Sequence, residues 1–324
     1  MRRPHHRWQL TLLVQAALGS AALAAGPAPQ APDNAAGSPE YIHVAQPGDT
    51  LIGVGRRFLA DPRQWPQLQR LNRVGEPRRL PIGQALRIPL RLMRVESAPM
   101  AVQAASGGVR SAGKPVAAGQ TLPAGNDLAT DRDGSVTVRL VDGTLLRLRS
   151  EGRVWLQESQ RLPMVDGARA GVRLEQGRVE VQAQRARGGQ PGFRILTPQG
   201  VLAVRGTEFR VSVDGQRTTG EVLSGVVAAV GRADGAATVP VAAGQGVVVD
   251  GNGRAGVALP LLPPPSLAGL PARHERPLVR LHLAPQPQAQ AWRVQVARDA
   301  DFDELLADVR STTPELRIAG LPDG

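Results

Sequence analysis

The sequence predicts a multidomain chain of mostly β structure, with a small βααβ domain, a larger all-β domain of the β-roll or sandwich type, and a partial β-sandwich. Three observations support this fold class. The chain has 324 residues, of which 37 are Gly and 28 are Pro, and only 3% are aromatic. Short runs rich in Val and Leu recur between turns that contain Gly and Asp, which is typical of short strands. The length is enough for two or three domains.

The net charge of the chain is +11 and comes almost entirely from arginine, since Lys114 is the only lysine. A basic surface suits nucleic acid, anionic lipid or an anionic cell-wall polymer. The arginines are interspersed with Asp and Glu and aromatic residues are few, so we expect a basic solvated surface and no nucleic-acid binding. The chain has no Cys, which excludes disulfides, thiolate metal sites, cysteine catalysis and a lipid-modified cysteine.

The first 25 residues have the three-part layout of a secretory signal peptide. A positive start is followed by an apolar run over residues 10–25, and Ala22-Leu23-Ala24 fits a cleavage site. An uncleaved membrane anchor is the alternative, but the run is short for the roughly 20 residues that span a bilayer. We therefore expect residues 1–25 to be cleaved and residues 26–40 to form a flexible linker. The exported protein then has no transmembrane span and lies in the periplasm or cell envelope.

Residues 41–92 are expected to form one small domain. Two short strands are predicted at its ends, over 41–44 and 84–88, with two helices between them. The apolar residues of the first helix recur at helical spacing: Leu51, Val54 and Phe58. Gly53 and Gly55 also lie within this helix, where each glycine costs roughly 1 kcal/mol relative to alanine.

Three motifs in this domain carry a resemblance to a known family. The run Y-I-H-V-A-Q-P-G-D-T-L begins at Tyr41, W-P-Q-L-Q-R-L-N begins at Trp65, and L-P-I-G-Q-A-L-R-I-P begins at Leu80. Their order and spacing resemble those of a LysM domain almost from end to end. The resemblance implies a βααβ fold that binds glycans containing N-acetylglucosamine, such as peptidoglycan or chitin.

The resemblance also implies a glycan groove between the loop before the first helix and the loop before the second strand. The matched positions are Gly48, Asp49, Thr50, Leu51, Leu80, Pro81 and Ile82. Backbone groups near a Gly can engage an acetamide, and small apolar side chains can receive its methyl group. One shallow groove suits a micromolar to millimolar affinity, about 4 to 8 kcal/mol. The structural alternative is that Asp49 and Thr50 only cap the helix and that Leu51 and Leu80 only fill the core.

Residues 100–253 show a different pattern, after a short linker that contains Ser97 and Pro99. Apolar residues alternate on both sides of Asp142-Gly143, which is a strong hairpin signal. Further short apolar runs follow at 172–174, 179–181, 193–196, 201–204, 209–213, 221–230 and 247–249. Strands of this length and spacing suit a sandwich, a barrel or a β-roll.

A second resemblance rests on residues 193–209, which contain the pattern T-P-x-G…V-R-G-T-x-F. Together with D-G-S-V…L-V-D-G-T-L-L-R-L-R upstream, this resembles the FecR domain. The signature residues are Thr197, Pro198, Arg205, Gly206, Thr207 and Phe209. We expect them to be structural, with Arg205 and Glu208 forming a local ion pair or satisfying backbone groups at a turn. A ligand role for Arg205 is the alternative.

The FecR resemblance implies an all-β, roll-like periplasmic domain. In regulators of this family the domain takes part in iron-responsive signalling across the membrane to a sigma factor. Those regulators begin with a cytoplasmic sigma-binding region, whereas the positive start that comes before the apolar run here is only seven residues long. We therefore expect the domain to be a structural or interaction module and not a direct relay.

Residues 254–273 form a Pro-rich linker that is expected to be extended. Residues 274–324 contain predicted strands at 278–283, 291–297 and 315–318, and resemble the first half of a fibronectin type III or immunoglobulin-like sandwich. More strands are needed to close two sheets. Either the chain is a fragment, which we favour, or this end pairs with a partner.

The sequence offers little support for catalysis. His43, His274 and His282 are isolated from one another and lack metal-binding spacing. No nucleophile elbow, phosphate-binding loop or dinucleotide motif occurs. Carboxylates are plentiful, so a carboxylate pair for glycan hydrolysis stays open. We expect no enzyme, no cofactor and no metal site.

These observations lead to one main hypothesis. The chain is expected to be an exported, non-catalytic envelope protein that binds peptidoglycan and presents its FecR-like domain to an unknown envelope protein. The first alternative is an envelope sensor or regulator that acts through a membrane partner. The second is a cell-wall hydrolase.

Overall fold

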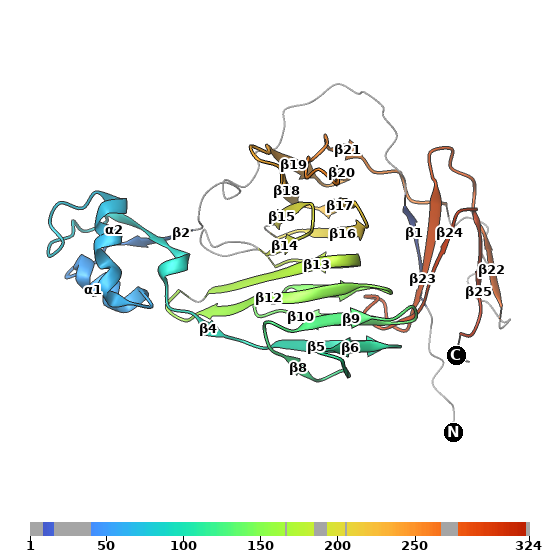
Figure 1. Ribbon diagram of the computed structural model, residues 1–324, viewed down its shortest axis with the longest axis horizontal. Helices are drawn as coiled ribbons and strands as arrows, with labels where there is room; N and C mark the ends of the chain where they lie inside the picture. The colour runs from blue at the N-terminus through green and yellow to red at the C-terminus, as the bar shows by residue number, and fades with distance from the viewer. Residues whose placement is uncertain are drawn as a thin grey trace.

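The computed structural model describes residues 9–15, 40–165, 167–184, 193–204, 206–266 and 278–321, with the backbone alone for 9–15. Three parts follow one another along the molecule (Figure 1). We call them the N-terminal unit (residues 40–95), the β roll (residues 96–260) and the C-terminal strands (residues 278–321). Among the described residues, no helix is both long enough and apolar enough to cross a membrane.

The N-terminal unit has the predicted βααβ fold. Its elements are β2 (Glu40–Val44), α1 (Leu51–Phe58), the 3₁₀ helix η1 (Pro62–Gln64), α2 (Trp65–Asn72), β3 (Ala85–Pro89) and the 3₁₀ helix η2 (Leu90–Leu92). Strands β2 and β3 pair antiparallel, with Tyr41 opposite Ile88. Leu51, Val54 and Phe58 are all buried, as the helical spacing predicts.

One of the two helical glycines has a packing reason. A Cβ atom at Gly55 would lie 2.9 Å from Cβ of Trp65 and 3.3 Å from the carbonyl oxygen of Pro62. Only glycine therefore lets α1 approach the start of α2 this closely. Gly55 lowers the helix propensity of α1, but its lack of a side chain allows the two helices to pack together.

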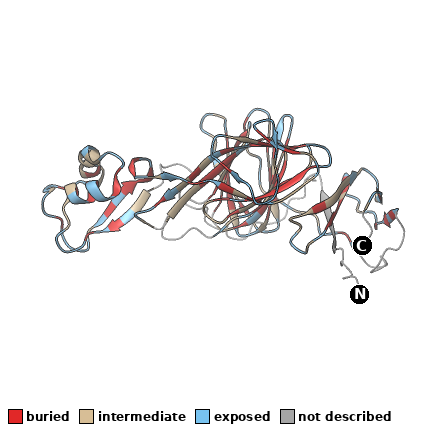
Figure 2. Ribbon diagram, turned by 90° about the horizontal axis from the view of Figure 1, so that it is seen from below, coloured by how far each residue is buried: buried red, intermediate tan, exposed pale blue. Residues whose placement is uncertain are grey.

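The β roll confirms the predicted all-β class. Its strands are β4 (Glu96–Ser97), β5 (Met100–Ser106), β6 (Val109–Ser111), β7 (Lys114–Pro115), β8 (Thr121–Leu122), β9 (Asp127–Thr130), β10 (Ser135–Arg139), β11 (Leu145–Leu148), β12 (Arg153–Leu162), β13 (Gly167–Gln182), β14 (Arg194–Leu196), β15 (Gly200–Val204), β16 (Glu208–Asp214), β17 (Arg217–Ser224), β18 (Val226–Gly231), β19 (Thr238–Ala242), β20 (Gln245–Val249) and β21 (Leu259–Pro260). All are connected by strand pairing. They form two layers with an aliphatic core between them, and Figure 2 shows how the buried residues concentrate there.

Strand β13 belongs to both layers. Its first half pairs with β12 and β14, and its second half pairs with β11 and β16. The bend lies at Gly177, which has a φ of +84°. A Cβ atom there would lie 2.5 Å from Cα of Gly152. The predicted runs at 172–174 and 179–181 are thus one bent strand, because the glycine between them bends the strand without ending it.

The opposite correction applies to the run at 221–230. The chain leaves β17 at Ser224 and enters β18 at Val226, with Gly225 at a φ of +81° between them. Strand β17 pairs with β16 and β20, whereas β18 pairs with β15 and β19. The left-handed glycine therefore carries the chain from one layer to the other.

The C-terminal strands are β22 (Val279–His282), β23 (Ala291–Ala297), β24 (Leu305–Ser311) and β25 (Glu315–Ile318). Strand β22 pairs with β25, and β23 pairs with β24. The two pairs share a small core that includes Trp292. Strand β24 was not predicted, because its sequence LLADVRS does not alternate strictly between apolar and polar residues.

Within the predicted signal peptide, the backbone of residues 9–15 forms β1 (Gln9–Gln15). It pairs antiparallel with the edge of β23 that β24 leaves free. Cleavage after residue 25 stays a prediction, and it would remove β1 from the exported protein.

Leu156 tests the importance of the core between the two layers. It is fully buried in this core, and Leu156→Ala is expected to lower the free energy of unfolding by about 2–5 kcal/mol. Denaturant unfolding followed by circular dichroism measures the change. Val257→Ala is the control, since Val257 is 74% exposed. Equal effects of the two substitutions would contradict this core.

Candidate functional site

The structure brings together the two loops that were predicted to form the groove. The amide of Ala45 donates to the carbonyl oxygen of Gln84 at 2.9 Å, and the amide of Gly83 donates to that of Ala45 at 2.8 Å. The amide of Leu51 donates to the carbonyl oxygen of Pro77 at 2.8 Å, which ties the start of α1 to the same loop. The loops before α1 and before β3 are therefore neighbours.

Asp49 holds the first loop in shape. Its Oδ2 accepts from the amide of Gln46 at 2.9 Å and lies 2.8 Å from Nε2 of His43. The backbone hydrogen bond from Gln46 and the contact with His43 lower the pKa of Asp49 below its usual value, against the smaller effect of burial. The carboxylate is thus already used within the loop.

The other groove positions divide into two groups. Thr50 is the N-cap of α1, because its Oγ1 accepts from the amide of Gly53 at 3.0 Å. Leu51 and Leu80 are buried in the core of the unit. The exposed positions at the surface are Gly48, Pro81 and Ile82. Ile82 is an apolar residue that is 72% exposed. The two loops each contain a glycine in the left-handed conformation, Gly48 in the first and Gly83 in the second.

The FecR signature residues build a turn and part of the core. Oγ1 of Thr197 accepts from the amide of Gly200 at 3.1 Å and lies 2.8 Å from the hydroxyl of Thr218. Phe209 is buried, and Gly206 has a φ of +66°. Thr207 is also buried, and its hydroxyl group has no hydrogen-bond partner among the described residues. Pro198 is exposed. Arg205 lies outside the described residues, and so does its expected pair with Glu208.

A charged row that the sequence did not predict crosses the outer face of one layer. Arg147, Glu180, Arg210 and Glu221 lie directly opposite one another on β11, β13, β16 and β17. Positive and negative charges alternate along this row. Cross-strand pairs of opposite charge stabilise a sheet.

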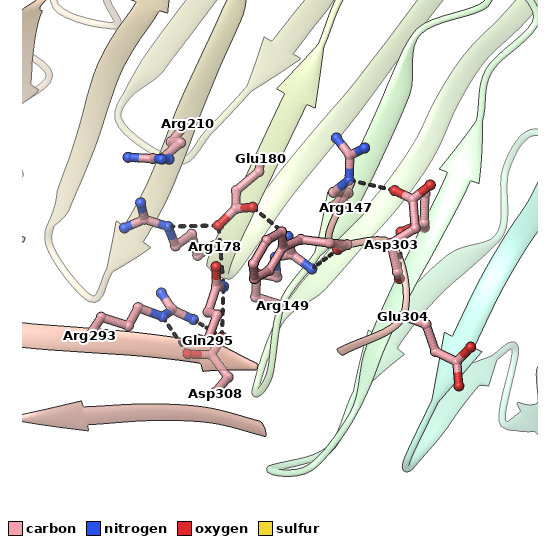
Figure 3. A network of polar contacts seen from close by, with 12 residues as sticks. Arg147, Arg149, Arg178, Glu180, Arg210, Arg293, Gln295, Asp303, Glu304 and Asp308 are labelled. Atoms are coloured by element: carbon pink, nitrogen blue, oxygen red, sulfur yellow. Dashed lines mark hydrogen bonds and ion pairs between the residues drawn. The ribbon is translucent and has the colours of Figure 1, made fainter. Parts of the chain in front are cut away.

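The C-terminal strands cover this row, and Figure 3 shows the contacts. Arg149 is almost completely buried, and it donates to Oε2 of Glu180 at 2.5 Å and to the carbonyl oxygen of Phe302 at 3.2 Å. Arg147 donates to Asp303 at 2.6 Å. Gln295 of β23 donates to Oε1 of Glu180 at 3.4 Å. The junction between the roll and the C-terminal strands is therefore largely polar.

Burial opposes the ionisation of Glu180, but the positive charge of Arg149 and the hydrogen bond from it outweigh this effect. Arg178 and Arg210 add to the attraction, and the pKa of Glu180 lies well below its usual range. A cavity of about 280 Å³ lies beside this cluster, with Arg147, Arg210 and Asp301 in its wall. No cluster of three or more metal-ligating side chains occurs among the described residues.

The sequence carried one signal for this junction. Arg147 alternates with the leucines of β11 and Arg149 follows directly after this strand, while Arg178 and Glu180 alternate with valines on β13. Alternation of this kind predicts which face is polar. It does not predict that another part of the chain covers that face.

Comparison with known proteins agrees with the two resemblances. The family model "LysM domain" matches residues 43–89, and the model "FecR protein" matches residues 126–228. Along the chain, the segment that matches LysM is followed by the segment that matches FecR. This is the predicted order, and the N-terminal unit is called the LysM domain from here on.

Two crystal structures of a "putative anti-sigma factor" from Parabacteroides distasonis ATCC 8503 are similar to part of the chain. The sequence identities are 18% and 19%, and the TM-scores are 0.33 and 0.34. Each match covers 41% of this chain and 59% of the other, so the chain spans somewhat more than half of their length. No curated protein matches the chain.

Asp49 gives a pH-dependent prediction. Because its pKa is lowered in the folded state, its contribution to stability is present above the unfolded value near 3.9 and is lost as the pH falls through the folded value. Between about pH 6 and about pH 3, the wild-type LysM domain should therefore lose more stability than Asp49→Asn. Thermal unfolding followed by the NMR amide signals of α1 measures both. Equal losses would show that the carboxylate does not hold the loop.

Glu180 gives a prediction for the polar junction. Glu180→Gln leaves the buried Arg149 without a carboxylate and is expected to cost about 3–5 kcal/mol of unfolding free energy. Glu208→Gln is the matched control, because Glu208 is exposed on the adjacent strand opposite Gln182. Chemical denaturation compares the two variants. A small effect of Glu180→Gln would mean that Arg149 does not depend on this pair.

Proposed function

We propose that the chain is an exported, non-catalytic envelope protein that binds peptidoglycan through its LysM domain. In this proposal residues 1–25 are a cleaved signal peptide, and the roll with the C-terminal strands is presented to another envelope protein. The observation that carries the proposal is the LysM match together with the meeting of its two groove loops. The exposed groove positions that can contact a glycan are Gly48, Pro81 and Ile82. Hydrogen bonds and core packing by the other four positions stabilise these loops: Asp49, Thr50, Leu51 and Leu80.

The position of the groove favours this function. The N-terminus of α1 lies at the groove. Its C-terminal residue Phe58 belongs to the same buried cluster as Leu162 of the roll, and the carbonyl oxygen of Phe58 accepts from the amide of Arg94 at 2.8 Å, just before the roll begins. The LysM domain also forms one end of the molecule (Figure 1). A glycan in the groove would therefore leave the roll accessible to a partner.

A regulator that acts through a membrane partner is the second candidate, because the FecR match covers the centre of the roll. The LysM and FecR families are not enzymes, which favours both binding functions over hydrolysis. The two candidates differ in what the LysM domain does. In the first it binds the wall, and in the second it can serve as a spacer.

Sedimentation of the exported protein with insoluble peptidoglycan tests the proposal. Wild type is expected to sediment, and Ile82→Asp should reduce the bound fraction about tenfold, since a charge replaces the exposed apolar contact. Val257→Asp is the control, because Val257 is 74% exposed and lies on the roll. Equal retention of the two variants would indicate that the binding site lies outside the groove. Absence of wild-type retention would reject wall binding and favour the regulator, and release of soluble fragments would favour a hydrolase.

A further inference from the structure

The core of the LysM domain contains a side chain from the roll. Leu162, at the end of β12, is fully buried in the same cluster as Phe58, Leu92 and Met93. Val165, in the turn that follows, packs against this cluster. Both residues lie about 70 positions beyond the LysM match in sequence. The LysM domain therefore does not bury its core with its own residues alone.

Backbone pairing holds this contact in place. The hairpin of β12 and β13 extends from the roll toward the LysM domain (Figure 1). Its outer part pairs with β4, with Gln160 opposite Ser97. The amide of Ala98 donates to the carbonyl oxygen of Ser159 at 2.9 Å. The chain between the two domains is thus fixed to the hairpin over several residues.

Helix α1 connects this contact with the groove. Thr50 caps the helix at the groove end. At the other end Leu59 forms a β-bridge with Met93, and the amide of Ala60 donates to the carbonyl oxygen of Leu92 at 2.9 Å. An α-helix of eight residues is only about 12 Å long. The groove and the hairpin contact are therefore the two ends of one short rigid element.

We infer that the tip of the β12–β13 hairpin is a positioning element for the glycan groove, with Leu162 as its central residue. This rests on the proposed function, since the ligand is the glycan of that groove. Leu162 closes the core under α1 and so fixes the start of the helix, which Thr50 caps, and the loop that precedes it. By linkage, a glycan that stabilises the loop also stabilises the packing of the hairpin. Occupancy of the groove is in this way transmitted to the roll.

Three variants of the exported full chain test the inference. Leu162→Asp places a charge in the buried site, Leu162→Met keeps its volume, and Met164→Asp changes a residue that is 38% exposed in the same turn. The first readout is hydrogen exchange of the amide of Val54 in α1, without ligand. Leu162→Asp should accelerate it at least about tenfold, while Leu162→Met and Met164→Asp should leave it near wild type.

The second readout uses a soluble tetramer of N-acetylglucosamine as the probe. The probe should slow the exchange of amides at 159–165 in wild type. Leu162→Asp should bind the probe about tenfold more weakly than wild type, whereas Leu162→Met should keep the wild-type affinity. Unchanged exchange of Val54 in Leu162→Asp would overturn the inference. So would probe binding to wild type without protection of the hairpin. If wild type does not bind the probe at all, the proposed function fails, and the exchange of Val54 alone decides whether the hairpin positions the loop.

Discussion

The arrangement of the whole molecule depends on the bend of β13 at Gly177. This strand joins the two layers of the roll, and its ends reach the two other parts of the chain. At one end, β13 forms a hairpin with β12 that contacts the LysM domain. At the other end, β13 carries Arg178 and Glu180, which lie under the C-terminal strands. The bend needs a positive φ, which disfavours a side chain, and a close approach to Gly152, which leaves no room for one. A residue with a Cβ atom would separate the layers and with them the two junctions.

The sequence predicted the secondary structure best where one local pattern decided it. The helical spacing of Leu51, Val54 and Phe58 placed α1, and alternation around Asp142-Gly143 placed β10 and β11. It failed where the partner is distant in the chain. Nothing near Leu162 indicates that its neighbours are Leu92 and Met93, and an apolar residue at a strand end is compatible with any core. Similarly, the sequence pattern of outward-facing charges on a strand is the same whether water or another sheet covers that face.

The candidate groove shows a limit of a different kind. The resemblance named seven positions of equal standing, whereas the structure gives them different tasks. Asp49 and Thr50 stabilise the loop, Leu51 and Leu80 fill the core, and Gly48, Pro81 and Ile82 remain at the surface. Capping residues and contact residues are both small or polar and lie in the same loops. Only burial and hydrogen bonding separate them, and these depend on the folded loop.

The two junctions of the roll differ in chemistry. Aliphatic side chains close the one with the LysM domain, whereas hydrogen bonds and ion pairs dominate the one with the C-terminal strands. Water can replace a polar partner as the parts separate, but it offers nothing to an exposed aliphatic cluster. In a protein fixed to the wall at one end and pulled at the other, the polar junction would therefore yield first. The C-terminal strands would then separate from the roll while the LysM domain keeps its fold.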